Sequence, residues 1–254
     1  MHEDELLGAQ MAFALASRLV FQEPEDGFYA SLIKEDVFEG APFGQDDPAV
    51  GEGLAMMRSW CLVQAGLDQE EFARAMRDMR SDWFMLLVGP GVPKAPNWAG
   101  FYLSVKSELM SQITLDVRRL YRRWGFVPDG VNKEPDDNLG ILLGFLAQLI
   151  AVEASCVGAG ECADEAVEAV NTHVAAAGSE ADAQAARDAQ EQVLVSYLLP
   201  WINTWRWHVA KHAHNDFLKG LGELVFGLCR AYAERFDMVF IEDGISSRFC
   251  RKGE

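Results

Sequence analysis

The sequence predicts an all-α protein, a helical bundle of roughly ten helices in two halves joined by a hinge loop. Apolar residues recur at helical spacing through most of the chain, and the residues between these segments are rich in the Pro and Gly that end helices. No run of alternating apolar residues with hairpin turns indicates a sheet. With 254 residues, the chain can form one large domain or two modest ones.

The first half, residues 1–125, is predicted to hold five helices. Residues 41–53, between the second and the third, are rich in turn-forming residues and are expected to be irregular. The fourth helix opens with Asp68 and Glu71 at the spacing of a capping box and ends at Gly89. The expected helices cover residues 5–22, 26–40, 53–66, 67–89 and about 107–124.

A stiff loop follows the fourth helix. Pro90, Pro93 and Pro96 each lack a backbone donor and restrict the residue before them, so the segment cannot be helical. Aromatic side chains at helical spacing are usually part of the core, and Trp83 fits that pattern. Trp98 stands in the loop, where a ring is expected to line a groove.

The hinge is predicted at residues 126–137, and the second half covers residues 138–254. Apolar residues from Leu139 to Ile150 indicate a core helix. Residues 158–192 are rich in Ala and acidic residues, which indicates solvated helix with a break at Gly178. Two further helices are expected over residues 193–217 and 218–236, with the break near Asn215 and Asp216.

Charge and composition exclude several function classes. The net charge of -17 repels nucleic acid and anionic membranes and attracts cationic ligands. Acidic residues stand where a secretory signal would be basic, so we expect a cytoplasmic protein without stable membrane insertion. The five cysteines form no CxxC pair, which favours buried thiols over a disulfide framework or a zinc site.

Glu134, Asp136 and Asp137 form a compact acidic motif just before the core helix. One interpretation is helix capping, because Asp is a preferred N-cap residue. The other is a carboxylate pair that accepts guanidinium groups through bidentate hydrogen bonds. The two are compatible, since one Asp could cap while the other binds.

Signals for catalysis are incomplete. His208 and His212 have the spacing of two zinc ligands and His214 is near, but the general-base Glu of an HExxH motif is missing. Neither a GxSxG nor a GxxxxGK[ST] motif is present. The sequence therefore predicts no catalytic residue, no metal and no cofactor, and a metal-dependent hydrolase using the 208–214 histidines stays as an alternative.

Two segments resemble the TorD/DmsD family of redox-enzyme maturation chaperones: LLVGPGVPKAPNWAGFYL (residues 86–103) and, after DVRRLYRRWGF, NKEPDDNLGILLGFLAQL (residues 132–149). The similarity extends to ALASRLVFQEP near the start and to LLPWINTW and HNDFLKGLGELV near the end. It therefore covers most of the chain in the order that the family shows.

The resemblance implies a cytoplasmic, non-catalytic chaperone that binds the twin-arginine signal peptide of a molybdenum-cofactor oxidoreductase. Pro96 and Trp98 match the family's proline loop, and Glu134–Asp137 match its acidic motif. Where the family's motif usually ends in His, this chain has Asn138, which can form hydrogen bonds but cannot become a cation. The residues expected to bind peptide are Trp83, Pro96, Trp98, Glu134, Pro135, Asp136, Asp137 and Asn138.

One further interpretation stays open, in which an assembly factor grips the folded client rather than its signal peptide. The oligomeric state is equally open, and either a monomer or a homodimer that exchanges halves through residues 126–137 fits the pattern.

Overall fold

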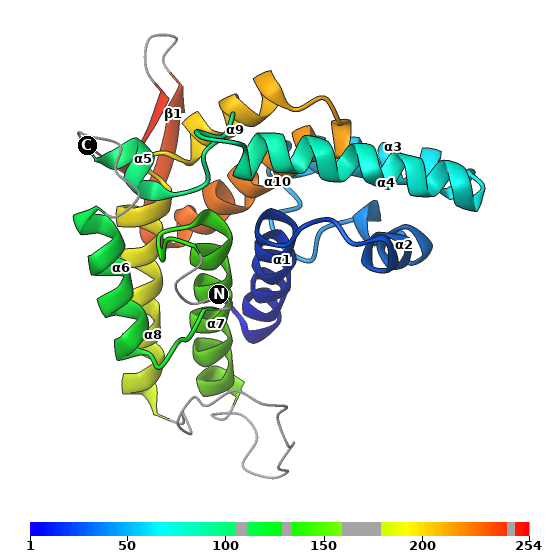
Figure 1. Ribbon diagram of the computed structural model, residues 1–254. Coiled ribbons are helices and arrows are strands. Elements are labelled where there is room, and N and C mark those ends of the chain that lie inside the picture. Colours follow the sequence, from blue (N-terminus) through cyan, green and yellow to red (C-terminus); the bar gives the residue numbers. More distant parts are fainter. Residues whose placement is uncertain (105–110, 129–133, 159–178, 243–246, 254) are drawn as a thin grey trace.

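The computed structural model describes residues 1–104, 111–128, 134–158, 179–242 and 247–253. These residues form α-helices and one small C-terminal hairpin (Figure 1), which confirms the all-α prediction. The elements are α1 Glu3–Phe21, α2 Asp26–Lys34, η1 Val37–Glu39, α3 Pro48–Ala65, α4 Gln69–Trp83, η2 Phe84–Val88, α5 Ala99–Leu103, α6 Gln112–Arg123, α7 Leu139–Gly158, α8 Glu180–Gln192, η3 Val193–Leu198, α9 Ile202–His212, α10 Asp216–Ala233, η4 Glu234–Phe236, β1 Met238–Glu242 and β2 Ser247–Arg251.

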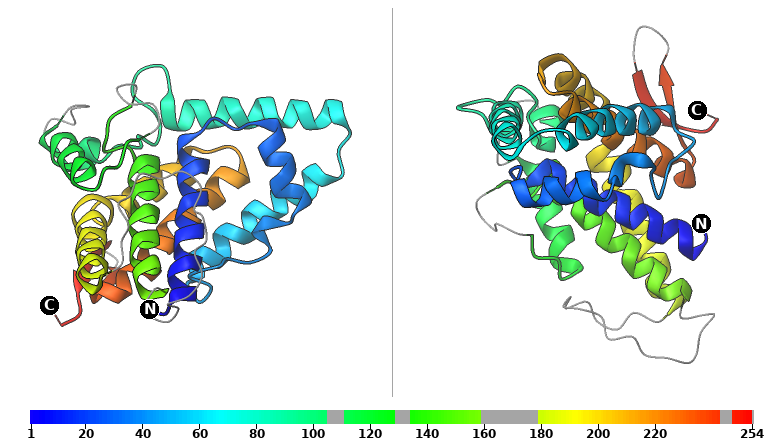
Figure 2. Two further views of the ribbon diagram at one scale, coloured as in Figure 1. Left: turned by 90° about the horizontal axis from the view of Figure 1, so that it is seen from below. Right: turned by 90° about the vertical axis from the view of Figure 1, so that its right-hand side faces the viewer.

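Helix α7 is the central helix of the bundle. It packs against α1 on one side and α8 on the other (Figures 1 and 2). Its segment Leu139–Val157 is the one stretch among the described residues that is long and apolar enough to cross a membrane, and 67% of it is buried. Burial from several sides accounts for a helix that is apolar all round.

Glycines let α1 and α7 approach closely. A side chain on Gly140 would lie 2.5 Å from Cβ of Phe21, and one on Gly144 would lie 2.9 Å from Oγ of Ser17. The Ser17 hydroxyl donates a hydrogen bond to the backbone oxygen of Gly140 at 2.7 Å. These contacts fix α1 antiparallel to the first turns of α7.

Helices α3 and α10 form a second close pair. A Cβ on Gly53 would meet the backbone oxygen of Gly220 at 2.6 Å, and the reverse contact is equally short. Asp47 caps α3 by accepting from the Ala49 amide at 2.9 Å and also pairs with Arg230 of α10 at 2.6 Å. The start of α3 is therefore held to α10 by an ion pair as well as by packing.

The described core is continuous across the predicted hinge. Buried residues of α1 and α3 belong to the same apolar cluster as those of α7 and α10. The division into halves at residues 126–137 stays a prediction, and residues 129–133 lie outside the described residues.

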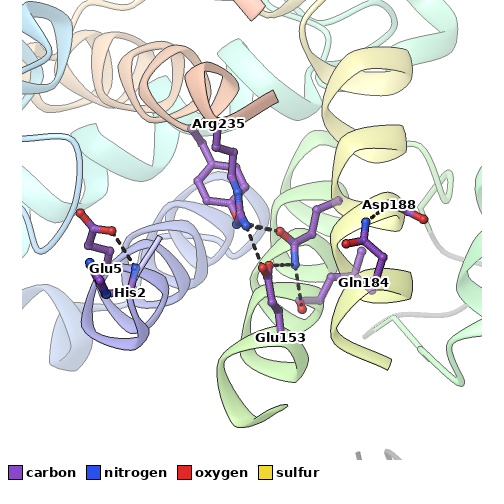
Figure 3. Close-up of polar contacts among 9 residues, drawn as sticks. His2, Glu5, Glu153, Gln184, Asp188 and Arg235 are labelled. Atoms are coloured by element: carbon purple, nitrogen blue, oxygen red, sulfur yellow. Dashed lines mark hydrogen bonds and ion pairs between the residues drawn. The ribbon is translucent and has the colours of Figure 1, made fainter. Parts of the chain in front are cut away.

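A buried polar cluster joins η4 to α7 and α8. Arg235 points towards Glu153 (Figure 3), with Nη2 and Oε1 2.8 Å apart. The amide nitrogen of Gln190 donates to Glu153 at 2.9 Å, and the Tyr232 hydroxyl donates to Gln190 at 2.6 Å. Both charges of the Glu153–Arg235 pair are almost completely shielded from water.

Three sequence expectations need correction. Helix α3 begins at Pro48 rather than at residue 53, because Asp47 caps it and Pro fits its first turn. The predicted helix from residue 193 is interrupted, and α9 starts at Ile202 after Pro200. A hairpin pairs β1 with β2, with Phe240 opposite Phe249, and its short alternating strands were missed.

The predicted solvated helix over residues 158–192 is described only in part. Residues 159–178 lie outside the described residues, and Ser179 caps α8.

Two glycines of α3 offer a direct test of the close α3–α10 contact. Gly53→Ala should lower the free energy of unfolding by about 1–3 kcal/mol, because its methyl group overlaps backbone atoms of α10. Gly51→Ala should raise it by up to about 1 kcal/mol, because that position is open and Ala favours helix. Urea unfolding followed by circular dichroism measures both changes, and equal effects would contradict the close contact.

Candidate functional site

The proline loop is folded back on the helix that precedes it. The π-helical turn η2 is followed by Gly89, whose positive φ of 54° reverses the chain. The amide of Ala95 then donates to the backbone oxygen of Leu86 at 2.8 Å. Pro93 and Pro96 are buried. The loop is thus folded back and held against η2.

The end of this loop pairs with the acidic motif. Trp98 and Asn138 form an antiparallel β-bridge. On one side of it the Leu139 amide donates to the Asn97 oxygen at 2.6 Å, and on the other the Ala99 amide donates to the Asp137 oxygen at 3.0 Å. The two segments that the sequence singled out therefore meet, backbone to backbone. We call residues 97–99 and 137–139 the junction.

Asp137 is an internal anchor of the junction. Its carboxylate has no exposed surface and accepts a hydrogen bond from the Gly100 amide at 2.6 Å. Burial raises the pKa of Asp137, while hydrogen bonds from Gly100 and from the Thr114 side chain act in the opposite direction. This carboxylate secures the start of α5 and faces α6 rather than solvent.

Asp136 is paired within the protein. Its Oδ2 accepts from Nε of Arg118 on α6 at 2.5 Å, and its backbone oxygen accepts from the Tyr121 hydroxyl at 2.8 Å. The side chain of Asp136 is 12% exposed. The arginine that this carboxylate binds is therefore supplied by the protein itself.

Asn138 provides the cap of α7. Its side-chain oxygen accepts from the Gly140 amide at 2.9 Å, and its backbone oxygen accepts from the Leu142 amide at 2.9 Å. The capping interpretation expected Asp136 or Asp137 to cap this helix. In the structure the cap is Asn138, one or two residues later. Asn serves as well as Asp here because both are strong N-cap residues.

The aromatic residues expected to line a groove lie in the interior. Trp98 is 9% exposed and packs against Phe101, with ring centroids 6.0 Å apart. The indole of Trp83 is also buried and donates to the Leu19 oxygen at 3.3 Å. Pro96 is buried, and its oxygen accepts from the Tyr102 hydroxyl at 2.9 Å. These side chains support the junction from inside.

Glu134 is the exposed carboxylate of the motif, and Pro135 is partly exposed. Partial burial raises the pKa of Glu134, and a hydrogen bond with the Asn138 side chain acts against that rise. Glu134 is therefore tied to the residue that starts α7.

A cavity with both apolar and polar lining adjoins this part of α7. It has a volume of about 280 Å³ and lies between α1, the first turns of α7 and residues 126–128. No sequence pattern predicted this cavity, although Gly140 and Gly144, which lie at the α1–α7 contact, are a signal for closely packed helices. Its apolar lining includes Ala14, Phe21, Phe126, Val127, Pro128 and Ile141.

The sequence profile of the nitrate reductase delta subunit family matches residues 44–206, well over half of the chain. The chain belongs to the nitrate reductase delta subunit family. This is a family of chaperones for molybdoenzyme maturation, and membership confirms the resemblance to TorD/DmsD proteins. The matched range contains the proline loop and the acidic motif. No curated protein gives a significant match to the chain.

His208, His212 and His214 do not form a metal site with other described residues of this protein. The rings of His208 and His212 stack with centroids 6.2 Å apart, and Nδ1 of His214 lies 3.2 Å from Asp82. No three His, Cys, Asp or Glu side chains among the described residues are placed to hold a metal ion. The geometry gives the hydrolase alternative no support.

Cysteines in the described ranges are free thiols. Burial raises the pKa of the Cys61 and Cys229 thiols to about 12, so both are protonated and unreactive at neutral pH. Cys162 lies outside the described residues.

Two substitutions of Asp137 test whether its carboxylate serves as a buried acceptor for the Gly100 amide. Asp137→Asn keeps an acceptor for the Gly100 amide and removes a buried charge, so stability at pH 7 should stay equal or rise. Asp137→Ala leaves that amide unpaired and should lower the free energy of unfolding by about 1–3 kcal/mol. Chemical denaturation measures both.

The pH dependence has a definite sign. The pKa of Asp137 is raised in the folded state, so that state binds more protons between the ordinary carboxyl pKa and the raised one. Over that window, wild-type stability should fall with rising pH relative to Asp137→Asn. A rise over the same window would show that the folded carboxylate is stabilised as an anion, contrary to its burial.

Proposed function

We propose that this protein is a cytoplasmic chaperone that binds the twin-arginine signal peptide of a molybdenum-cofactor oxidoreductase and assists maturation before export. The observation that carries the proposal is the exposed carboxylate of Glu134, which is hydrogen-bonded to Asn138 at the start of α7, while the first turns of α7 line a cavity with apolar residues. Family membership supports the molybdoenzyme as client.

The chemistry of such a peptide matches these features. Its paired arginines need a carboxylate that can accept guanidinium hydrogen bonds, and its apolar segment needs an apolar surface. Glu134 meets the first need, and the cavity beside Phe126 and Val127 meets the second. Arg18 also lines the cavity, and its guanidinium lies over the Phe28 ring at 3.5 Å.

In this proposal only the accessible candidate residues contact the peptide, and the buried ones hold them in place. The peptide contacts Glu134 and Pro135, which are accessible. The junction holds both in place through the buried residues Trp83, Pro96, Trp98, Asp136, Asp137 and Asn138. The proposal assigns no catalytic role to any of them.

Calorimetry with synthetic peptides tests the proposal. A peptide with the Arg-Arg pair should bind at least about ten-fold more tightly than its Lys-Lys variant, because ammonium groups cannot form bidentate bonds to a carboxylate. Equal binding, or no binding of either peptide up to about 1 mM (about -4 kcal/mol), would contradict specific recognition.

Glu134 gives the matching protein-side test. Glu134→Gln should weaken Arg-Arg peptide binding by about five- to ten-fold, since it removes one charge-assisted contact. Glu52→Gln, at an exposed position of α3, is the matched control and should leave affinity unchanged. If a client without its signal peptide binds as tightly as the complete client, recognition of the folded body replaces the proposal.

A further inference from the structure

A second cavity lies on a different part of the molecule and is lined by residues from the ends of α4 and α9. Its volume is about 500 Å³, within the range of small-molecule sites. Met85 of η2, Lys94 of the proline loop and Lys211 of α9 all line it. None of these residues lines the cavity between α1 and α7.

The cations of this cavity are available for a ligand. Lysine forms two ion pairs between described residues, Lys34–Glu35 and Lys219–Asp216, and neither Lys94 nor Lys211 takes part in one. The ammonium of Lys211 lies 5.1 Å from the centroid of the exposed Trp207 ring. Two lysines from separate elements thus line one cavity in a chain with a net charge of -17.

His212 also lines this cavity. Its pKa is lowered, first by loss of solvation and then by Coulombic interaction with neighbours that include Lys211 and Lys94. Lys211 of α9 and Lys94 of the proline loop therefore both lie near this ring. An anion placed among them would gain electrostatic free energy.

Two acids, Asp78 and Asp82, also line the cavity, so the lysines face two carboxylates as well as any ligand. Asp82 is engaged, because Oδ2 accepts from the amides of His214 at 2.8 Å and Asn215 at 2.7 Å. The ring of His214 lies beside its other oxygen. Asp78 lies one turn earlier on α4, on the wall formed by α4, whereas the lysines come from the loop and from α9.

We propose that this cavity binds a small molecule with a doubly charged oxyanion, such as a phosphate monoester, held by Lys94 and Lys211. Two point-like ammonium charges suit a compact dianion, and the described lining has no arginine fork of the kind that favours a planar carboxylate. Met85, which is 43% exposed, offers an apolar contact for the body of the ligand. The site is separate from the proposed peptide site and needs no client.

Calorimetric titration of the whole chain with phenyl phosphate at constant ionic strength tests this inference. We expect saturable binding with a Kd at or below about 1 mM. Lys94→Gln and Lys211→Gln should each weaken binding by about five- to ten-fold, because each removes one charge-assisted contact. Lys34→Gln is the control, since that side chain is 82% exposed on α2, and it should have no effect.

The identity of the ligand is tested by two comparison probes. Benzoate, which carries one charge, should bind several-fold more weakly than phenyl phosphate, and equal binding would overturn the dianion assignment. Inorganic phosphate should also bind more weakly, and equal affinity would overturn the apolar contact while supporting the anion site. No saturable binding of phenyl phosphate up to about 10 mM, or equal loss in all three lysine variants, would overturn the proposal.

Discussion

The backbone pairing of Trp98 with Asn138 holds the proposed peptide site together. Through it, a proline loop that begins at Gly89 is attached to the first turn of α7, the helix at the centre of the core. Each hydrogen bond of the junction contributes only about 1 kcal/mol net, but leaving a buried partner unpaired costs about 1–3 kcal/mol. The junction therefore tolerates little change in the direction of either segment. Glu134 lies three residues before Asp137, so the junction also limits where its carboxylate can lie.

Much of the fold follows from local sequence signals. Helical periodicity located α1 and α7, and the capping box of Asp68 and Glu71 located the start of α4. The start of α3 was missed because Pro48 and its flanking glycines also suit a turn. In the structure Asp47 caps this helix and also pairs with Arg230 of α10. The ion pair with a distant part of the chain favours a helix that begins at Pro48.

The sequence predicted where the candidate site lies in the chain, but it did not predict which of its side chains are exposed to solvent. Glu134, Asp136 and Asp137 look equivalent in sequence, yet one is exposed, one is paired with Arg118 and one is fully buried. These differences depend on α5 and α6, which arrive from elsewhere in the chain. The cavity beside α7 depends in the same way on which helix faces Gly140, and no short motif encodes that contact.

The buried cluster of Glu153, Gln190 and Arg235 joins α7 and α8 directly, without help from the chain that connects them. A break of the backbone between α7 and α8 would therefore leave these two helices attached to each other through side chains.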